Sequence, residues 1–125
     1  MNVVDSSGWL EYFADGANAG FFAPTIEASA ELLVPALALF EVFKRVAQQR
    51  GEAAALQAIG LMQQARVIAL DASLAVEAAR VSLLHRLPMA DSVILATART
   101  YGAELWTQDR DLAGLDGVRY QARVS

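Results

Sequence analysis

The chain has 125 residues, of which 55% are hydrophobic and 19% are charged, and it contains no cysteine and one histidine. This composition excludes a disordered chain, disulfide bonds, and zinc sites that need thiolates or several imidazoles from one chain. The net charge of −4 argues against a nucleic-acid-binding protein without excluding one, because clustered carboxylates can hide a local basic patch in the total. No apolar run reaches the ~20 residues that span a bilayer, and the N-terminus has no signal-peptide pattern. We therefore expect a soluble cytoplasmic protein.

The predicted elements alternate between strands and helices. In chain order we expect a strand over 1–4, helices over 8–15 and 23–30, a strand over 32–34, helices over 36–50 and 52–65, a strand over 67–70, helices over 74–87 and 88–101, a strand over 103–106, a short helix, and a strand over 118–122. Asp71 or Ser73 is expected to cap the helix over 74–87, and Asp109 or Asp111 the short helix. Strands separated by helices indicate a parallel sheet covered on both faces, so we predict an α/β protein with a single domain over 1–125.

An aspartate ends the first predicted strand, in the stretch VVDSS. In parallel α/β sheets ligands bind beyond the carboxyl ends of the strands. Asp5 lies at that end of the first strand, and Thr107 and Asp109 lie at that end of the fourth. Aspartate also favours turns and helix caps, so position alone leaves a structural and a functional role for Asp5 equally open.

Two predicted helices carry an acid in apolar surroundings. Glu41, in LALFEVFKR, lies opposite the apolar stripe of its helix. Considered by itself, Glu41 is explained by an i, i+4 ion pair with Arg45 on a solvated face. Leu37 and Phe40 nevertheless flank Glu41 on that face, as the wall of a pocket would. Asp91, in LPMADSVILATA, lies in a first helical turn, where a carboxylate interacts well with the helix dipole. That helix is apolar nearly all round, and a buried carboxylate is costly unless it is paired or bound to metal.

The stretch LWTQDRDL contains two further acids. One aspartate is enough to cap a short helix, so the second needs another explanation. Asp5, Glu41, Asp91 and Asp109 would all lie at one edge of the sheet, where like charges destabilise a fold unless a cation holds them. Oxygen ligands favour Mg²⁺ or Mn²⁺, and such clusters typically catalyse phosphoryl transfer or phosphodiester hydrolysis. Arg110 lies in the same loop, where an RNA phosphate contact and an ordinary surface charge explain it equally well.

The order VVDSS, LALFEVFKR, LPMADSVILATA and LWTQDRDL resembles the PIN-domain ribonucleases, and is most similar to the VapC-type toxins of bacterial toxin–antitoxin modules. The resemblance covers essentially the whole chain and implies a three-layer α/β/α sandwich with a central, mainly parallel sheet. It implies four catalytic acids, which are Asp5, Glu41, Asp91 and Asp109. Of these, Asp5 and Asp91 would bind the metal ion, and Glu41 and Asp109 would bind it directly or through water.

The resemblance also implies a function. Proteins of this kind are Mg²⁺- or Mn²⁺-dependent endoribonucleases that act on RNA, usually form homodimers, and are silenced by an antitoxin whose tail covers the acidic site. Thr107 matches a hydroxyl position that often lines the site, and Ser6 matches a small polar position after the first acid. Asp111 has no firm counterpart, and we interpret it as a cap.

Two other functions use related patterns. Haloacid-dehalogenase-like phosphatases also begin with an aspartate after a first strand, but they need a second aspartate two residues later, where this chain has Ser7. A non-catalytic PIN-like scaffold in a protein or RNA complex would have the same fold with purely structural acids. Such a scaffold predicts no metal-dependent activity.

Overall fold

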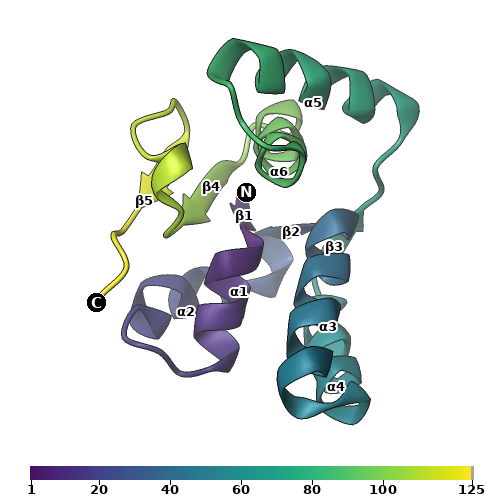
Figure 1. Cartoon of the computed structure of the whole chain (residues 1–125), viewed down its shortest axis with the longest axis vertical. Coiled ribbons are helices and arrows are strands. Elements are labelled where there is room, and N and C mark those ends of the chain that lie inside the picture. Colours follow the sequence, from purple (N-terminus) through teal and green to yellow (C-terminus); the bar gives the residue numbers. More distant parts are fainter. Residues whose placement is uncertain (125) are drawn as a thin grey trace.

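Within residues 1–124, which the structure describes, five parallel strands form a central sheet in the order β3-β2-β1-β4-β5 (Figure 1). In this computed structural model the strands are β1 (Asn2–Val4), β2 (Leu32–Pro35), β3 (Arg66–Ile68), β4 (Glu104–Thr107) and β5 (Val118–Tyr120). Each neighbouring pair is parallel, so the carboxyl ends of the strands lie at one edge of the sheet. The predicted parallel α/β fold is confirmed.

Helices cover both faces of this sheet (Figure 1). They are α1 (Ser6–Phe13), α2 (Ala19–Glu27), α3 (Ala36–Arg50), α4 (Glu52–Met62), α5 (Ala72–His85) and α6 (Met89–Thr100), with 3₁₀ turns η1 (Ser29–Glu31) and η2 (Arg110–Leu112). Side chains that alternate along a strand face opposite layers. Val3 accordingly packs in one core with residues of α5 and α6, and Val4 packs in the other core with residues of α1 to α4. These two cores confirm the predicted three-layer sandwich.

The helices of the described residues, 1–124, are all too short or too polar to cross a membrane. The interior between them is well filled, with large side chains such as Trp9, Phe22 and Leu105 at most 1% exposed. Gly8 shows how tightly the first helix is packed, because a Cβ atom there would lie 2.6 Å from both Phe22 and Val4. The absence of a side chain at Gly8 therefore lets α1 begin directly against β1.

The first two helices differ from their predicted bounds. The first begins at Ser6 rather than at Gly8, because the Asp5 carboxylate accepts the Gly8 N–H and caps the helix. The second spans 19–27 rather than 23–30. Pro24 favours a first helical turn, which moves the predicted start towards it, but in the structure Pro24 lies inside α2. Burial of the neighbouring Phe22 and Ile26 outweighs this local preference.

The remaining elements keep their predicted order with small shifts at their ends. The helix expected over 36–50 has those bounds. Asp71 rather than Ser73 caps α5, where its side chain accepts the Leu74 N–H at 2.8 Å. Helix α4 ends at Met62, and strands β3 and β5 are shorter than expected, covering 66–68 and 118–120.

Candidate active site

Asp5 lies at the carboxyl end of β1, which is the central strand of the sheet. Its side chain is 4% exposed, and three donors hold it. Oδ1 accepts hydrogen bonds from the Gly8 N–H at 2.9 Å and the Ser7 hydroxyl at 2.8 Å, and Oδ2 accepts one from the Thr107 hydroxyl. Burial raises the pKa of Asp5 to about 6, although these three hydrogen bonds act in the opposite direction. The carboxylate is therefore both a helix cap and a fixed, poorly hydrated acid.

Thr107 connects Asp5 to the loop that follows β4. Its hydroxyl donates to Asp5 Oδ2 and accepts the Asp109 N–H at 2.8 Å. Asp109 in turn caps η2, because its Oδ1 accepts the Asp111 N–H at 2.9 Å. Thr107 is fully buried, so this chain of bonds fixes the spacing between the ends of two neighbouring strands.

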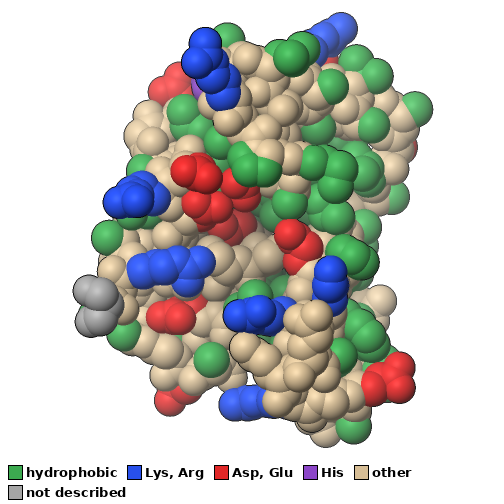
Figure 2. Space-filling view, in the orientation of Figure 1, with side chains coloured by type: hydrophobic (Ala, Val, Ile, Leu, Met, Phe, Trp, Pro, Cys, Tyr) green, Lys and Arg blue, Asp and Glu red, His purple; other side chains and the backbone are tan. Residues whose placement is uncertain are grey.

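Three aspartates converge beside this loop. One carboxylate oxygen from each of Asp91, Asp109 and Asp111 lies within 4.8 Å of the others. Figure 2 shows a group of acidic side chains near the middle of this face, with separate Lys and Arg side chains around it. The interpretation of Asp111 as a cap was wrong, because Asp109 is the cap and the Asp111 carboxylate joins the group.

The pKa of Asp91 shows that these acids repel one another. Partial burial and then the charge of Asp109 raise this pKa to about 7, with further contributions from a hydrogen bond with Asp109 and from the charges of Asp5 and Asp111. Without a cation, the group therefore retains a proton near neutral pH rather than ionising completely. A divalent cation would remove this repulsion, and the ligands on offer are oxygens of the kind that Mg²⁺ and Mn²⁺ prefer. The donor set thus fits such an ion.

Glu41 lies next to the N-terminus of α1. Its Oε1 accepts a hydrogen bond of 2.5 Å from the Ser6 hydroxyl, and the side chain is half-buried. The alternative ion pair with Arg45 is not found among the ion pairs of residues 1–124. Glu41 and Asp5 are outside the group of three converging aspartates, although Asp5 is near enough for its charge to act on Asp91. The structure thus brings the predicted acids to one edge of the sheet in two neighbouring sets.

Two buried amide side chains, which the sequence did not single out, hold the loop after β4. The Asn18 amide donates to Gln108 Oε1 at 3.0 Å and to the Ala122 carbonyl at 2.9 Å, and its own oxygen accepts from Gln121 at 3.0 Å. The Gln108 amide donates to the Ser7 carbonyl at 3.3 Å. This network ties the loop carrying Asp109 to the first turn of α1. The one signal for it in the sequence is the place of Gln108 between Thr107 and Asp109.

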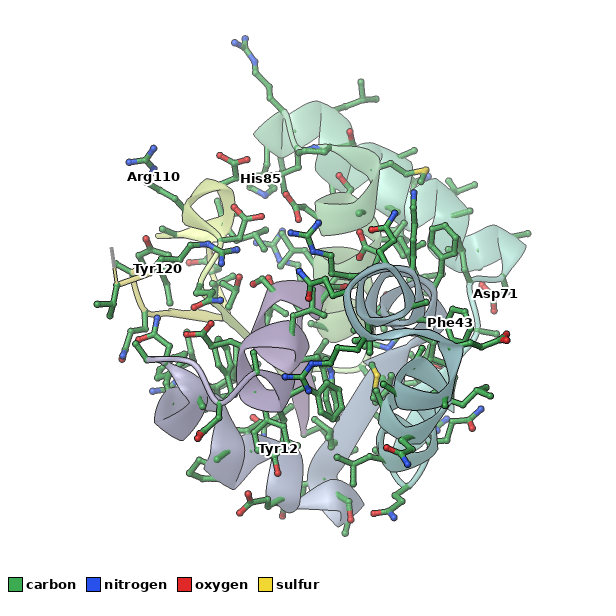
Figure 3. All side chains as sticks on the ribbon, turned by 60° about the horizontal axis from the view of Figure 1, so that its bottom comes forward. Tyr12, Phe43, Asp71, His85, Arg110 and Tyr120 are labelled. Carbon is green, nitrogen blue, oxygen red and sulfur yellow. The ribbon has the colours of Figure 1, made fainter. Side chains whose placement is uncertain are left out.

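Arg110 differs from the acids in its surroundings. It is exposed, and Figure 3 shows its side chain extending outwards from the edge of the molecule. No hydrogen bond or ion pair to another described residue holds it. Contact with an RNA phosphate stays a prediction for this residue.

The protein is thus a parallel α/β sandwich that carries a group of carboxylates at the carboxyl edge of its sheet. Comparison of the sequence with protein families then matches the PIN domain over residues 3–118. The chain is a member of the PIN domain family, as its motifs predicted.

Solved structures with a similar fold include toxins of toxin–antitoxin systems. A toxin–antitoxin complex from Klebsiella pneumoniae has 20% identity and a TM-score of 0.80, over 95% of this chain and 96% of that chain. The VapC20 toxin of Mycobacterium tuberculosis, which cleaves the sarcin–ricin loop, has 22% identity and a TM-score of 0.76, over 95% of this chain and 99% of that one. VapBC2 from Rickettsia felis, bound to a promoter DNA fragment, has 8% identity and a TM-score of 0.72, over 97% of each chain. A comparison with curated proteins gives no match.

Proposed function

We propose that this protein is a metal-dependent endoribonuclease, and that it is the toxin of a toxin–antitoxin pair. The observation that carries this proposal is the convergence of Asp91, Asp109 and Asp111 beside the buried Asp5, in a member of the PIN domain family. Acids placed this close raise one another's pKa, and a cation lets all of them ionise at neutral pH. The reaction would be hydrolysis of RNA phosphodiester bonds.

The proposed metal ligands are Asp5 and Asp91, with Glu41 and Asp109 binding directly or through water. The structure adds Asp111 to this set, since its carboxylate lies in the same group. A bound Mg²⁺ or Mn²⁺ would supply Lewis acidity towards a phosphate oxygen and would lower the pKa of water at the site.

The protein's own contribution is to hold these oxygens in place. The Ser7, Gly8 and Thr107 donors orient Asp5, and the Ser6 hydroxyl orients Glu41. Ligands that are fixed before the substrate arrives need no reorganisation during the reaction, which is a main source of electrostatic catalysis. Ser6 and Thr107 are therefore proposed as residues that position the acids.

An antitoxin partner, a homodimer and a cytoplasmic location belong to the same proposal. Several structurally similar proteins are described as parts of toxin–antitoxin complexes, which supports an antitoxin that blocks the acidic site. Three of the most exposed large apolar side chains lie where α5 meets α6, namely Leu83, Leu84 and Met89, which are 83%, 75% and 72% exposed. A second copy of the chain would remove such a surface from water.

The decisive experiment measures RNA cleavage with Mg²⁺ or Mn²⁺ and with excess EDTA. Wild-type protein should cleave RNA with the ion and lose activity with EDTA. Asp91→Asn should reduce kcat/KM by ~100-fold or more, since the metal contributes several kcal/mol to transition-state stabilisation. Asp116→Asn is the matched control, because Asp116 is exposed and outside the acid group. Cleavage that persists in EDTA, or an active Asp91→Asn protein, would contradict the proposal.

A further inference from the structure

A groove of about 790 Å³ lies between α1 and the helices α3 and α4. It lies beside the acidic site, because Ser7 and Gln108 are among its lining residues. Ser7 donates to the Asp5 carboxylate, and Gln108 lies between Thr107 and Asp109 in the sequence. A ligand that fills this groove would therefore lie next to the site.

The groove is lined by arginines that have no side-chain partner among residues 1–124. Half of the ten basic side chains of residues 1–124 are engaged, in contacts that pair Arg80 with Glu77, Arg119 with Glu104, Arg99 with His85, Arg66 with Tyr101 and Lys44 with Phe40. Within the same residues, no hydrogen bond, ion pair or cation–π contact engages the side chains of Arg45, Arg50, Arg86, Arg110 and Arg123. Of these, Arg45, Arg50 and Arg123 line the groove.

The single acid of the groove does not neutralise these charges. Glu11 is the one acid among the described residues that line the groove, so it offsets only one of the three positive charges there. Figure 2 shows blue side chains bordering a hollow beside the red acidic group. In a protein with a net charge of −4, this concentration of unpaired positive charge indicates an anionic ligand.

The other lining residues favour RNA over a small anion. Leu10, Phe13 and Leu61 offer apolar surface, and Gln49 and Gln57 offer amide groups. Single-stranded nucleic acid is bound by this combination, in which cations contact phosphates and apolar or aromatic side chains contact bases. The acidic site also repels a polyanion, so binding there needs neighbouring cations to offset the repulsion.

We propose that the groove binds the single-stranded RNA next to the scissile phosphate, with Arg45, Arg50 and Arg123 contacting its phosphates. This inference deepens the proposed function, since it places the substrate of the same site. It also explains how an acidic protein can bind RNA, because the positive charge is local to one groove.

The test compares Arg50→Gln and Arg123→Gln with Arg80→Gln, an equal charge change on the exposed side of α5. Binding of a fluorescently labelled single-stranded RNA is measured by anisotropy in EDTA, at several salt concentrations, so that the result does not depend on cleavage. Each groove variant should weaken binding by ~3–10-fold at low salt and reduce the slope of log K against log salt by ~0.7. Arg80→Gln should bind like wild type, and all variants should keep the wild-type Tm.

Cleavage assays then separate the two proposals. With Mg²⁺, the groove variants should raise KM and leave kcat unchanged, because they do not touch the acids. Wild-type affinity and salt dependence in both groove variants would overturn the proposal that RNA binds in the groove. The ligand of the groove would then be a protein segment instead. RNA binding through the groove by a wild-type protein that does not cleave would keep this inference and overturn the proposed enzyme.

Discussion

Asp5→Asn should stabilise the metal-free protein at alkaline pH. The Asp5 carboxylate is 4% exposed, and its pKa rises from an ordinary value of 3.8 to about 6 in the fold. The folded protein therefore binds this proton more tightly than the unfolded chain does. The stability that Asp5 contributes is fully present below pH 3.8 and is lost as the pH rises through about 6.

The size of the effect follows from the two pKa values. A difference of about two between them corresponds to ~3 kcal/mol of destabilisation by the ionised carboxylate. Asparagine keeps an oxygen for the Gly8 and Ser7 donors, but it leaves the Thr107 hydroxyl without its acceptor, which costs ~1 kcal/mol. The net gain is ~2 kcal/mol. An unfolding entropy of ~2.1 cal/mol/K per residue, taken over this chain, converts the gain to a rise of ~8 °C in Tm.

Thermal unfolding in EDTA at pH 8 and pH 4 measures this gain. The rise in Tm should be present at pH 8 and absent at pH 4, where much of the unfolded-state carboxyl is also protonated. Asp116→Asn should change neither value, because that side chain is exposed. An unchanged or lower Tm at pH 8 would refute the argument that burial penalises the charge. A gain of equal size at both pH values would show that ionisation is not its cause.

Two further predictions concern the packing around the site. Gly8→Ala should lower the free energy of unfolding by ~1–3 kcal/mol in urea titrations, because the new Cβ would lie 2.6 Å from Phe22. Gly60→Ala, with nothing within 4 Å of its Cβ, should instead gain up to ~1 kcal/mol from its higher helix propensity, and a loss there equal to that at Gly8 would remove the steric explanation. Asn18→Ala should cost ~2–3 kcal/mol by the same measurement, because it leaves the buried Gln108 Oε1 without its donor. It should also lower kcat of the proposed nuclease, and a destabilised protein with wild-type kcat would limit Asn18 to a structural role.

The layered fold and the acids of the site could be predicted because their signals are local. Strand and helix patterns alternate along the whole chain, and Asp5, Glu41 and Asp91 each interrupt an apolar stretch. A charge that breaks an apolar pattern is informative, since burial makes it costly. The order of the elements and the predicted sandwich were therefore confirmed.

Contacts between distant segments could not be predicted in this way. Asn18 and Gln108 are 90 residues apart, and each looks like an ordinary polar residue in its own stretch. Asp111 was misread because a cap needs one acid and the sequence cannot say which of two neighbours supplies it. The shift of α2 has the same origin, since the core around Phe22 and Ile26 outweighs the local preference of Pro24.

The central place of β1 also sets when during synthesis the site can form. Val4 pairs with Trp106 in β4, so β1 must wait until about a hundred further residues have been made before the sheet closes around Asp5. The Thr107 hydroxyl and the three converging aspartates are complete only after residue 111 has emerged. Long-range pairing of this kind is slow compared with local helix formation. A nuclease built on this plan would stay inactive as a nascent chain until residue 111 has emerged and folded.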